Sequence, residues 1–130
     1  MDLLLYQPNH ASTNRAPLFD HGGAPVILGI NFWGNHAIHP DPGIRITTNW
    51  MESGRNPYVD LSGVTNNRAT EACRGINVRQ WPVERILKEG FALATFYRGD
   101  IAPDFPNGMT NGVLSLYPEL QGRGDNFSTI

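Results

Sequence analysis

Polar and aromatic residues follow two predicted strands, and their positions favour a ligand-binding site. The first strand, Val26–Asn31, runs into a loop that ends at His36, and the second, Phe91–Tyr97, runs into Arg98–Asp104. Open α/β sheets bind ligands just past the carboxyl ends of their parallel strands. The candidate residues that line this site are Asn31, Phe32, Asn35, His36, Arg98, Asp100 and Asp104.

Acyl transfer is one reaction that such loops support, and it needs a nucleophile, a base within reach and donors for the oxyanion. The chain has serines at positions 12, 53, 62, 115 and 128, and none of them stands in a G-x-S-x-G motif. The residues therefore predict no catalytic nucleophile on this chain.

Two histidines and an aspartate, His36, His39 and Asp41, form the sequence H-x-x-H-P-D. A metal site would need a third and a fourth ligand on a rigid backbone, and Pro40 keeps this stretch from being helical. We therefore interpret both histidines as hydrogen-bonded loop residues and predict no metal. No G-x-G-x-x-G, P-loop, HExxH or CxxC motif occurs, so we predict no cofactor.

The loop after the second strand has two carboxylates, Asp100 and Asp104, that could act as a pair. Aspartate also bonds readily to nearby backbone N–H groups in turns, and we favour that structural use for each. Arg98-Gly99-Asp100 and Arg123-Gly124-Asp125 are both RGD tripeptides. A three-residue match carries little information, and the first follows a buried strand, so neither predicts an adhesion site.

A helix is predicted between the two strands. Trp81-Pro82 opens it, because proline is favoured at the first helical position, and Val83, Ile86 and Leu87 form one apolar stripe. Gly90 ends it. A strand, a helix and a second strand form a right-handed crossover by default, so the strands are expected to be parallel. Both strands lack charge and alternation, which is typical of strands covered on both faces.

The remaining segments give weaker signals. Leu3–Gln7 reads as a strand, whereas residues 37–76 show no clear periodicity, and the role of this long segment stays open. The single cysteine, Cys73, excludes an intrachain disulfide and is interpreted as a small loop residue.

Length and charge bound the class of protein. A chain of 130 residues with a net charge of −2 predicts one domain and no broad attraction to nucleic acid or membranes. The N-terminus lacks a positive region and has a short apolar run, so no signal peptide is predicted.

Four blocks of sequence, in order, resemble the glucuronoyl esterase family of carbohydrate esterases, whose members are often labelled acetyl xylan esterases. The blocks are Pro25–Pro42, Arg79–Glu84, Tyr97–Asp104 and Asn111–Val113. Family members have N-F-x-G-N-H followed by P-D-P, a helix start R-W-P-V-E and a strand end Y-x-G-D-I-x-P-D. Gln80 is a local departure from the helix motif. The four blocks match the family in both order and spacing. The resemblance covers nearly the whole chain.

The resemblance implies an α/β-hydrolase fold, present here in part and incomplete at both ends. Residues 1–130 would form a single partial domain containing the early strands, with Leu3–Gln7 antiparallel, the first crossover helix and the following strand. The implied reaction is serine ester hydrolysis on glucuronoxylan, a plant cell-wall polysaccharide. The implied role of Asn31–His36 is to supply a backbone oxyanion donor.

The sequence departs from the family in one respect that decides its activity. The family's serine lies in a G-C-S-R-x-G elbow, and the elbow arginine, the catalytic acid and the histidine are all expected downstream of this chain. We therefore expect a fragment that lacks the triad and is inactive alone. Within a complete enzyme, Asp100→Ala would cost stability at least as much as rate.

Two other interpretations stay open. The chain could be a non-catalytic carbohydrate-binding or interaction module, in which Trp33, Trp50 and Trp81 would stack on sugars. It could also be one half of a two-chain enzyme, or self-associate through exposed strand edges. Complete family members are expected to be secreted or periplasmic, and no compartment is assigned to this chain.

Overall fold

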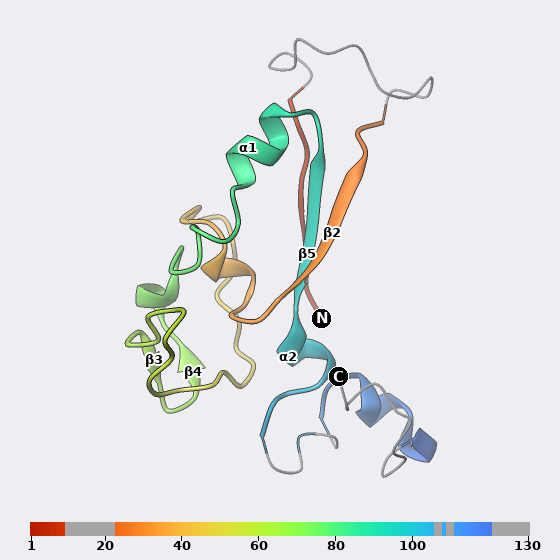
Figure 1. Cartoon of the computed structure of the whole chain (residues 1–130). Helices are drawn as coiled ribbons and strands as arrows, with labels where there is room; N and C mark the ends of the chain where they lie inside the picture. Colours follow the sequence, from red (N-terminus) through yellow and green to blue (C-terminus); the bar gives the residue numbers. More distant parts are fainter. Residues whose placement is uncertain (10–22, 106–107, 109–110, 121–130) are drawn as a thin grey trace.

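A three-stranded sheet organises the computed structural model, which describes residues 1–9, 23–105, 108 and 111–120 (Figure 1). The strand order is β1 (Leu3–Tyr6), β5 (Ala92–Tyr97) and β2 (Val26–Asn31). β5 pairs antiparallel with β1 and parallel with β2, and Asn31 lies opposite Tyr97. The predicted strands, the parallel pair and the antiparallel first strand are confirmed.

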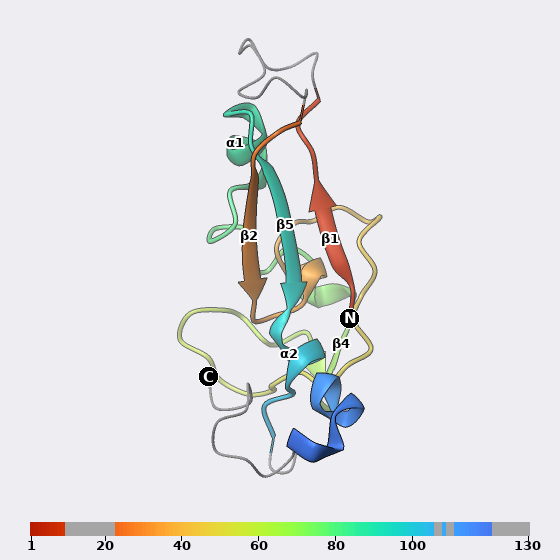
Figure 2. The same cartoon turned by 90° about the vertical axis from the view of Figure 1, so that its right-hand side faces the viewer.

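β5 is the buried strand of this sheet, as its uncharged run predicts. Leu93 and Thr95 have no exposed surface, and Ala92 and Ala94 expose 2% and 7%. Partners flank the strand on both sides (Figure 2). A central strand of this kind fixes where the loop that follows it begins.

β2 is an edge strand among the described residues, and the prediction that it is covered on both faces is wrong for them. Leu28 and Ile30 remain 67% and 49% exposed. Side chains alternate along a strand, so the observed register places both on one face of the sheet with Leu3 and Leu5. An uncharged sequence is compatible with a strand that is buried on both faces. It does not determine which segment of the protein covers each face.

The opposite face of the sheet carries the helix α1 (Val83–Lys88). Ile38, Val83 and Leu93 form the buried cluster between them. Gly90 follows the helix at φ +85, the left-handed conformation that glycine accepts most readily. The predicted helix and its glycine stop are confirmed.

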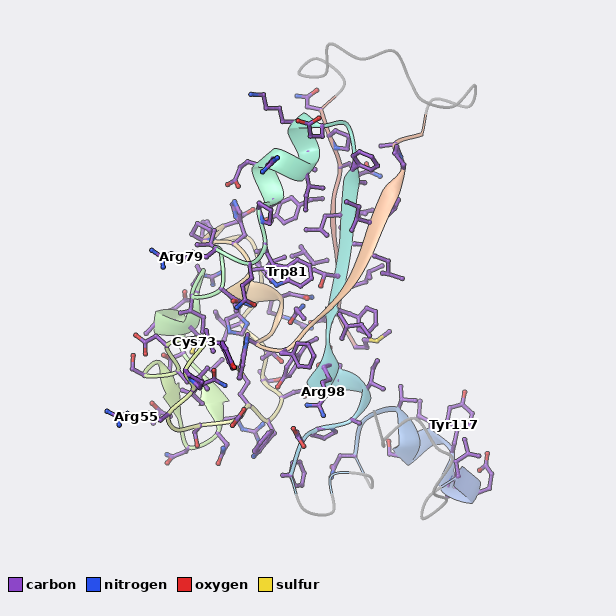
Figure 3. All side chains as sticks on the ribbon, viewed as in Figure 1. Arg55, Cys73, Arg79, Trp81, Arg98 and Tyr117 are labelled. Atoms are coloured by element: carbon purple, nitrogen blue, oxygen red, sulfur yellow. The ribbon has the colours of Figure 1, made fainter. Side chains whose placement is uncertain are left out.

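Trp81 connects the start of α1 to the edge strand. The indole lies so close to Gly29 in β2 that a Cβ on this glycine would be 2.7 Å from the Trp81 ring. Figure 3 shows Trp81 directed from the helix side toward the sheet. A glycine in mid-strand therefore makes room for the aromatic ring that anchors the helix.

The segment 37–76 contains short elements that its sequence pattern does not predict. A hairpin of β3 (Val64–Thr65) and β4 (Arg68–Ala69) turns at Asn66 and Asn67, whose φ angles are 51 and 57. Two consecutive positive φ angles are typical of the tight turn that matches strand twist. Asn67 also joins the hairpin to the preceding loop, because its N–H₂ group donates to the Met51 carbonyl at 2.9 Å.

Short helices lie before α1 and after β5. Glu71–Cys73 forms a 3-10 turn in which Cys73 is buried, so this cysteine is a packed residue of a short helix and the prediction of a plain loop position is wrong. α2 (Arg98–Ile101) continues directly from β5 and has Gly99 buried. Among the described helices, none combines the length and apolar character needed to cross a bilayer.

Candidate functional site

A cavity of about 710 Å³ lies at the carboxyl ends of the two parallel strands. It is lined by Ile30 and Phe32 from the end of β2, and by residues of the loop that follows β5. This is the sheet edge at which open α/β proteins bind ligands. The other lining residues are Trp33, Trp50, Glu52, Asn56, Tyr97, Arg98, Gly99, Ile101, Ala102 and Asp104.

Three of the candidate residues predicted from sequence meet in this cavity: Phe32, Arg98 and Asp104. Arg98 Nη1 donates to Asp104 Oδ2 at 3.0 Å, and the guanidinium lies 5.7 Å from the centre of the Phe32 ring. Figure 3 shows Arg98 at the junction of β5 and α2. The ion pair and the cation–π contact together fix the position of the Arg98 guanidinium in the wall of this cavity.

The loop after β2 contains a cavity-lining residue, Trp33, whose backbone donor is unused among the described residues. The Trp33 N–H group has no hydrogen-bond partner among the described residues. Gly34 follows it at φ +85 and begins the 3-10 turn Asn35–Ala37. A free N–H group at a cavity-lining residue is the kind of donor that an oxyanion requires.

Asn31 and Asn35 are buried behind the cavity and do not line it. Asn31 Nδ2 donates to Asn35 Oδ1 at 2.7 Å and to Thr95 Oγ1 at 3.1 Å. Asn35 Nδ2 in turn donates to the Asp2 carbonyl at 2.9 Å. These two candidates therefore join β2, β5 and the start of β1, and they hold the loop in place.

His36 is fully buried, and neither of its ring nitrogens has a partner among the described residues. The interpretation of His36 as a hydrogen-bonded loop histidine is therefore wrong. Burial, and to a smaller extent the nearby Arg74, lower the pKa of its imidazole to about 4, while Glu71 opposes the shift. The ring packs under Gly34, where a Cβ would lie 2.5 Å from it.

Asp100 lies in α2 and borders a neighbouring cavity instead of the first one. Its Oδ2 accepts the Asp2 N–H at 3.1 Å, and its Oδ1 accepts the Asn49 side-chain N–H₂. Both carboxylate oxygens are thus engaged in holding other segments. This geometry suits the structural role that the sequence favours for Asp100.

Tyr97 and Trp50 line the cavity although neither was predicted to line the site of the hydrolase; Trp50 was named only as a sugar-stacking residue of the alternative binding module. The Tyr97 hydroxyl donates to the Trp50 carbonyl at 2.9 Å and fixes the segment that carries the indole. Burial raises the pKa of Tyr97, with Asp100 as the next cause, so the hydroxyl keeps its proton. Sequence spacing gave no signal for this contact, which joins residues 47 positions apart.

His39 forms a polar cluster at the other end of the sheet. Its Nδ1 accepts the Asp41 N–H at 3.0 Å, so its Nε2 carries a proton and donates to Glu84 Oε1, with 2.9 Å between the two atoms. The Tyr6 hydroxyl donates to Asp41 at 3.2 Å, and burial raises its pKa to about 12. His39 is thus a hydrogen-bonded loop histidine, as predicted.

No group of three metal-ligating side chains occurs in the described part of the chain.

The mixed sheet, the crossover helix and the cavity at the strand ends define a partial α/β-hydrolase fold. In sequence and structure the chain corresponds to the N-terminal part of glucuronoyl-esterase-like carbohydrate esterases. The resemblance read from the four sequence blocks is confirmed. No protein-family model matches the chain.

Three relatives illustrate this similarity. A carbohydrate esterase named MZ0003, from an unknown prokaryotic organism, is 38% identical over 117 residues, which are 90% of this chain and 24% of that protein. A promiscuous CE15 esterase from a marine bacterial metagenome matches with a TM-score of 0.65 and 36% identity, over 93% of this chain and 26% of its own. A glucuronoyl esterase from Solibacter usitatus matches with a TM-score of 0.65 and 37% identity, over 90% and 25%. The chain spans about a quarter of the length of these relatives.

Proposed function

We propose that this chain forms one wall of the ester-binding site of a glucuronoyl-esterase-like serine hydrolase, with polysaccharide esters of glucuronoxylan type as substrates. The observation that carries the proposal is the cavity of about 710 Å³ at the carboxyl ends of β2 and β5. Its aromatic lining suits the apolar part of an ester, and the Trp33 N–H group suits the developing oxyanion.

The chain is proposed to hold the substrate and not to attack it. Its serines lie outside any nucleophile motif, and Ser115, which borders the neighbouring cavity, donates to the Gly112 carbonyl at 2.7 Å. The nucleophile, the acid and the histidine of the reaction are therefore assigned to sequence outside these 130 residues. The chain alone is expected to be inactive as an esterase.

A chimera tests this function. The 130 residues would replace the matching segment of the Solibacter usitatus esterase, and hydrolysis of a benzyl ester of glucuronic acid would be followed. We expect the chimera to hydrolyse the ester and the isolated chain not to. Phe32→Ala in the chimera should lower kcat/KM about tenfold through lost packing, while Tyr58→Ala, at an exposed aromatic outside the cavity, serves as the control. A folded chimera without activity would refute the proposal.

A second candidate role is that of one half of a two-chain enzyme, and the open face of β2 favours it. Val26, Leu28 and Ile30 are each about half or more exposed, and the outer edge of β2 has no partner strand among the described residues. Edges of this kind pair with other chains. The same surface supports self-association when no such partner is present.

A further inference from the structure

A second cavity, of about 630 Å³, adjoins the first one at Trp50 and Gly99, which line both. Its volume lies within the range of about 300–1,000 Å³ that is typical of small-molecule sites. The two cavities differ in chemistry. The first has a largely apolar lining that includes Phe32, Trp33 and Tyr97. The second is bordered by more hydrogen-bonding side chains, among them Thr48, Asn49, Arg68, Asp100 and Ser115.

Two aromatic rings give the second cavity an apolar surface among these polar groups. The Trp50 indole lies 5.4 Å from the Phe105 ring, centre to centre, and is tilted by 48° against it. Phe105 borders the second cavity but not the first. The Trp50 main chain is held by the Tyr97 hydroxyl, so the indole sits on a fixed backbone.

The charges of the second cavity favour a neutral ligand. The Asp100 carboxylate already accepts two hydrogen bonds, from the Asp2 N–H and the Asn49 side chain, and it would repel an anion. Arg68 is exposed and uses one nitrogen, Nη1, to bond the Thr48 carbonyl. Its other donors have no partner among the described residues.

An aromatic platform surrounded by polar side chains is suited to a sugar ring, which has an apolar face and a rim of hydroxyl groups. We propose that the second cavity is a subsite for a neutral sugar unit of the polysaccharide, next to the unit whose ester lies in the first cavity. Trp50 stacks on the sugar ring, and Arg68 donates to its hydroxyl groups. This inference rests on the proposed function, since it places the two parts of one polysaccharide ester in adjoining cavities.

Binding of xylohexaose to the 130-residue chain, measured by titration calorimetry, tests the subsite. This probe is a neutral oligosaccharide without any ester, so binding is read separately from hydrolysis. We expect Arg68→Met to weaken binding about tenfold, because a charge-assisted hydrogen bond is lost. Trp50→Leu should weaken it by at least as much. The matched control is Arg79→Met, since Arg79 is an exposed arginine that borders neither cavity and points away from the sheet in Figure 3.

The arginine pair keeps the test decisive even where Trp50→Leu perturbs folding, because both arginines are exposed. Equal affinity of the wild type and Arg68→Met would overturn the subsite, as would a wild-type chain that binds no xylohexaose. A chimera that hydrolyses the benzyl ester while its parent chain fails to bind xylohexaose would leave the proposed function standing and remove only the subsite. Weakened binding in Arg68→Met with unchanged binding in Arg79→Met is the supporting result.

Discussion

His36 gives the site loop a dependence on pH that can be worked out from its burial. The unfolded imidazole takes up a proton near its ordinary value of 6.5, whereas the folded one does so only near pH 4. Between these values the unfolded state binds more protons, so stability falls as pH falls. From pH 6.5, where the unfolded imidazole is half protonated, to pH 5 the loss should be about 1.5 kcal/mol, because a full pH unit between the two pKa values corresponds to about 1.4 kcal/mol.

Urea unfolding at pH 7, 6 and 5 measures this slope in the wild type and in His36→Leu. The leucine variant should lose the His36 part of the slope, while His39→Gln keeps His36 and should retain it. The range stays above the ordinary values of the carboxyl groups near the site, so acid titration of Glu71 and Asp41 contributes little. Identical slopes in the wild type and His36→Leu would contradict the assignment.

A second prediction at the level of single residues concerns Gly29. A Cβ at this position would lie 2.7 Å from the Trp81 ring, and a rigid indole cannot yield without moving the start of α1. We expect Gly29→Ala to destabilise the chain by about 1–3 kcal/mol, as overpacking does. The control is Gly23→Ala, where an added Cβ meets nothing within 4 Å. Equal unfolding free energies for the two variants would show that Trp81 does not anchor the helix.

Single residues of the site were predictable where they follow a strand end, and less so elsewhere. Phe32 and Arg98 come directly after strands, and their place in the cavity follows from the parallel pair. Trp50 enters from a segment without periodicity, through one hydrogen bond to a distant tyrosine. His36 follows β2 by five positions, but its burial depends on how the loop turns at Gly34, which the residue types alone do not determine.

At the level of elements, the open face of β2 predicts that the chain self-associates. A single charged residue introduced on this face should prevent that association. Leu28 is 67% exposed in the middle of the edge strand β2, on the apolar face of the sheet. We expect the wild-type chain to self-associate with rising concentration, and Leu28→Lys to stay monomeric, because a lysine on an edge strand resists pairing. Sedimentation velocity measures the two. Leu116→Lys introduces the same charge at a residue that is 74% exposed outside the sheet, and it should associate like the wild type.

Sequence patterns predicted the bounds of the main elements better than their burial. The bounds of β2, β5 and α1 follow from apolar runs, Pro82 and Gly90, which act locally. Whether β2 is covered is a property of its neighbours, so its composition could not settle this. The β3–β4 hairpin has two residues in each strand and turns at Asn66 and Asn67, an asparagine pair that signals a turn only weakly without glycine.

At the scale of the whole molecule, the two faces of the sheet differ in how far the described residues cover them. α1 lies over one face (Figure 1), while the other presents the exposed residues Leu3, Leu5, Val26, Leu28 and Ile30. The relatives are about four times as long as the matched segment, so their additional sequence is available to cover this face. The open face and the unused Trp33 donor lie on the same strand and the loop that follows it, so a partner that pairs with β2 would also reach the cavity.

Complementation in trans tests whether that partner completes the site. The 130-residue chain would be co-expressed with the remaining three quarters of the Solibacter usitatus esterase, and hydrolysis of the benzyl ester would be measured for each part and for the pair. We expect activity from the pair and none from this chain alone, because the nucleophile must come from the added part. Leu28→Lys should weaken the association about a hundredfold, since burying an unpaired charge at the interface costs about 3 kcal/mol. At concentrations that just saturate the wild-type pair, the variant pair should therefore lose activity. An excess of either part should restore that activity. Activity that is equal in both pairs at limiting concentration would show that the open face of β2 is not where the rest of the enzyme joins this chain.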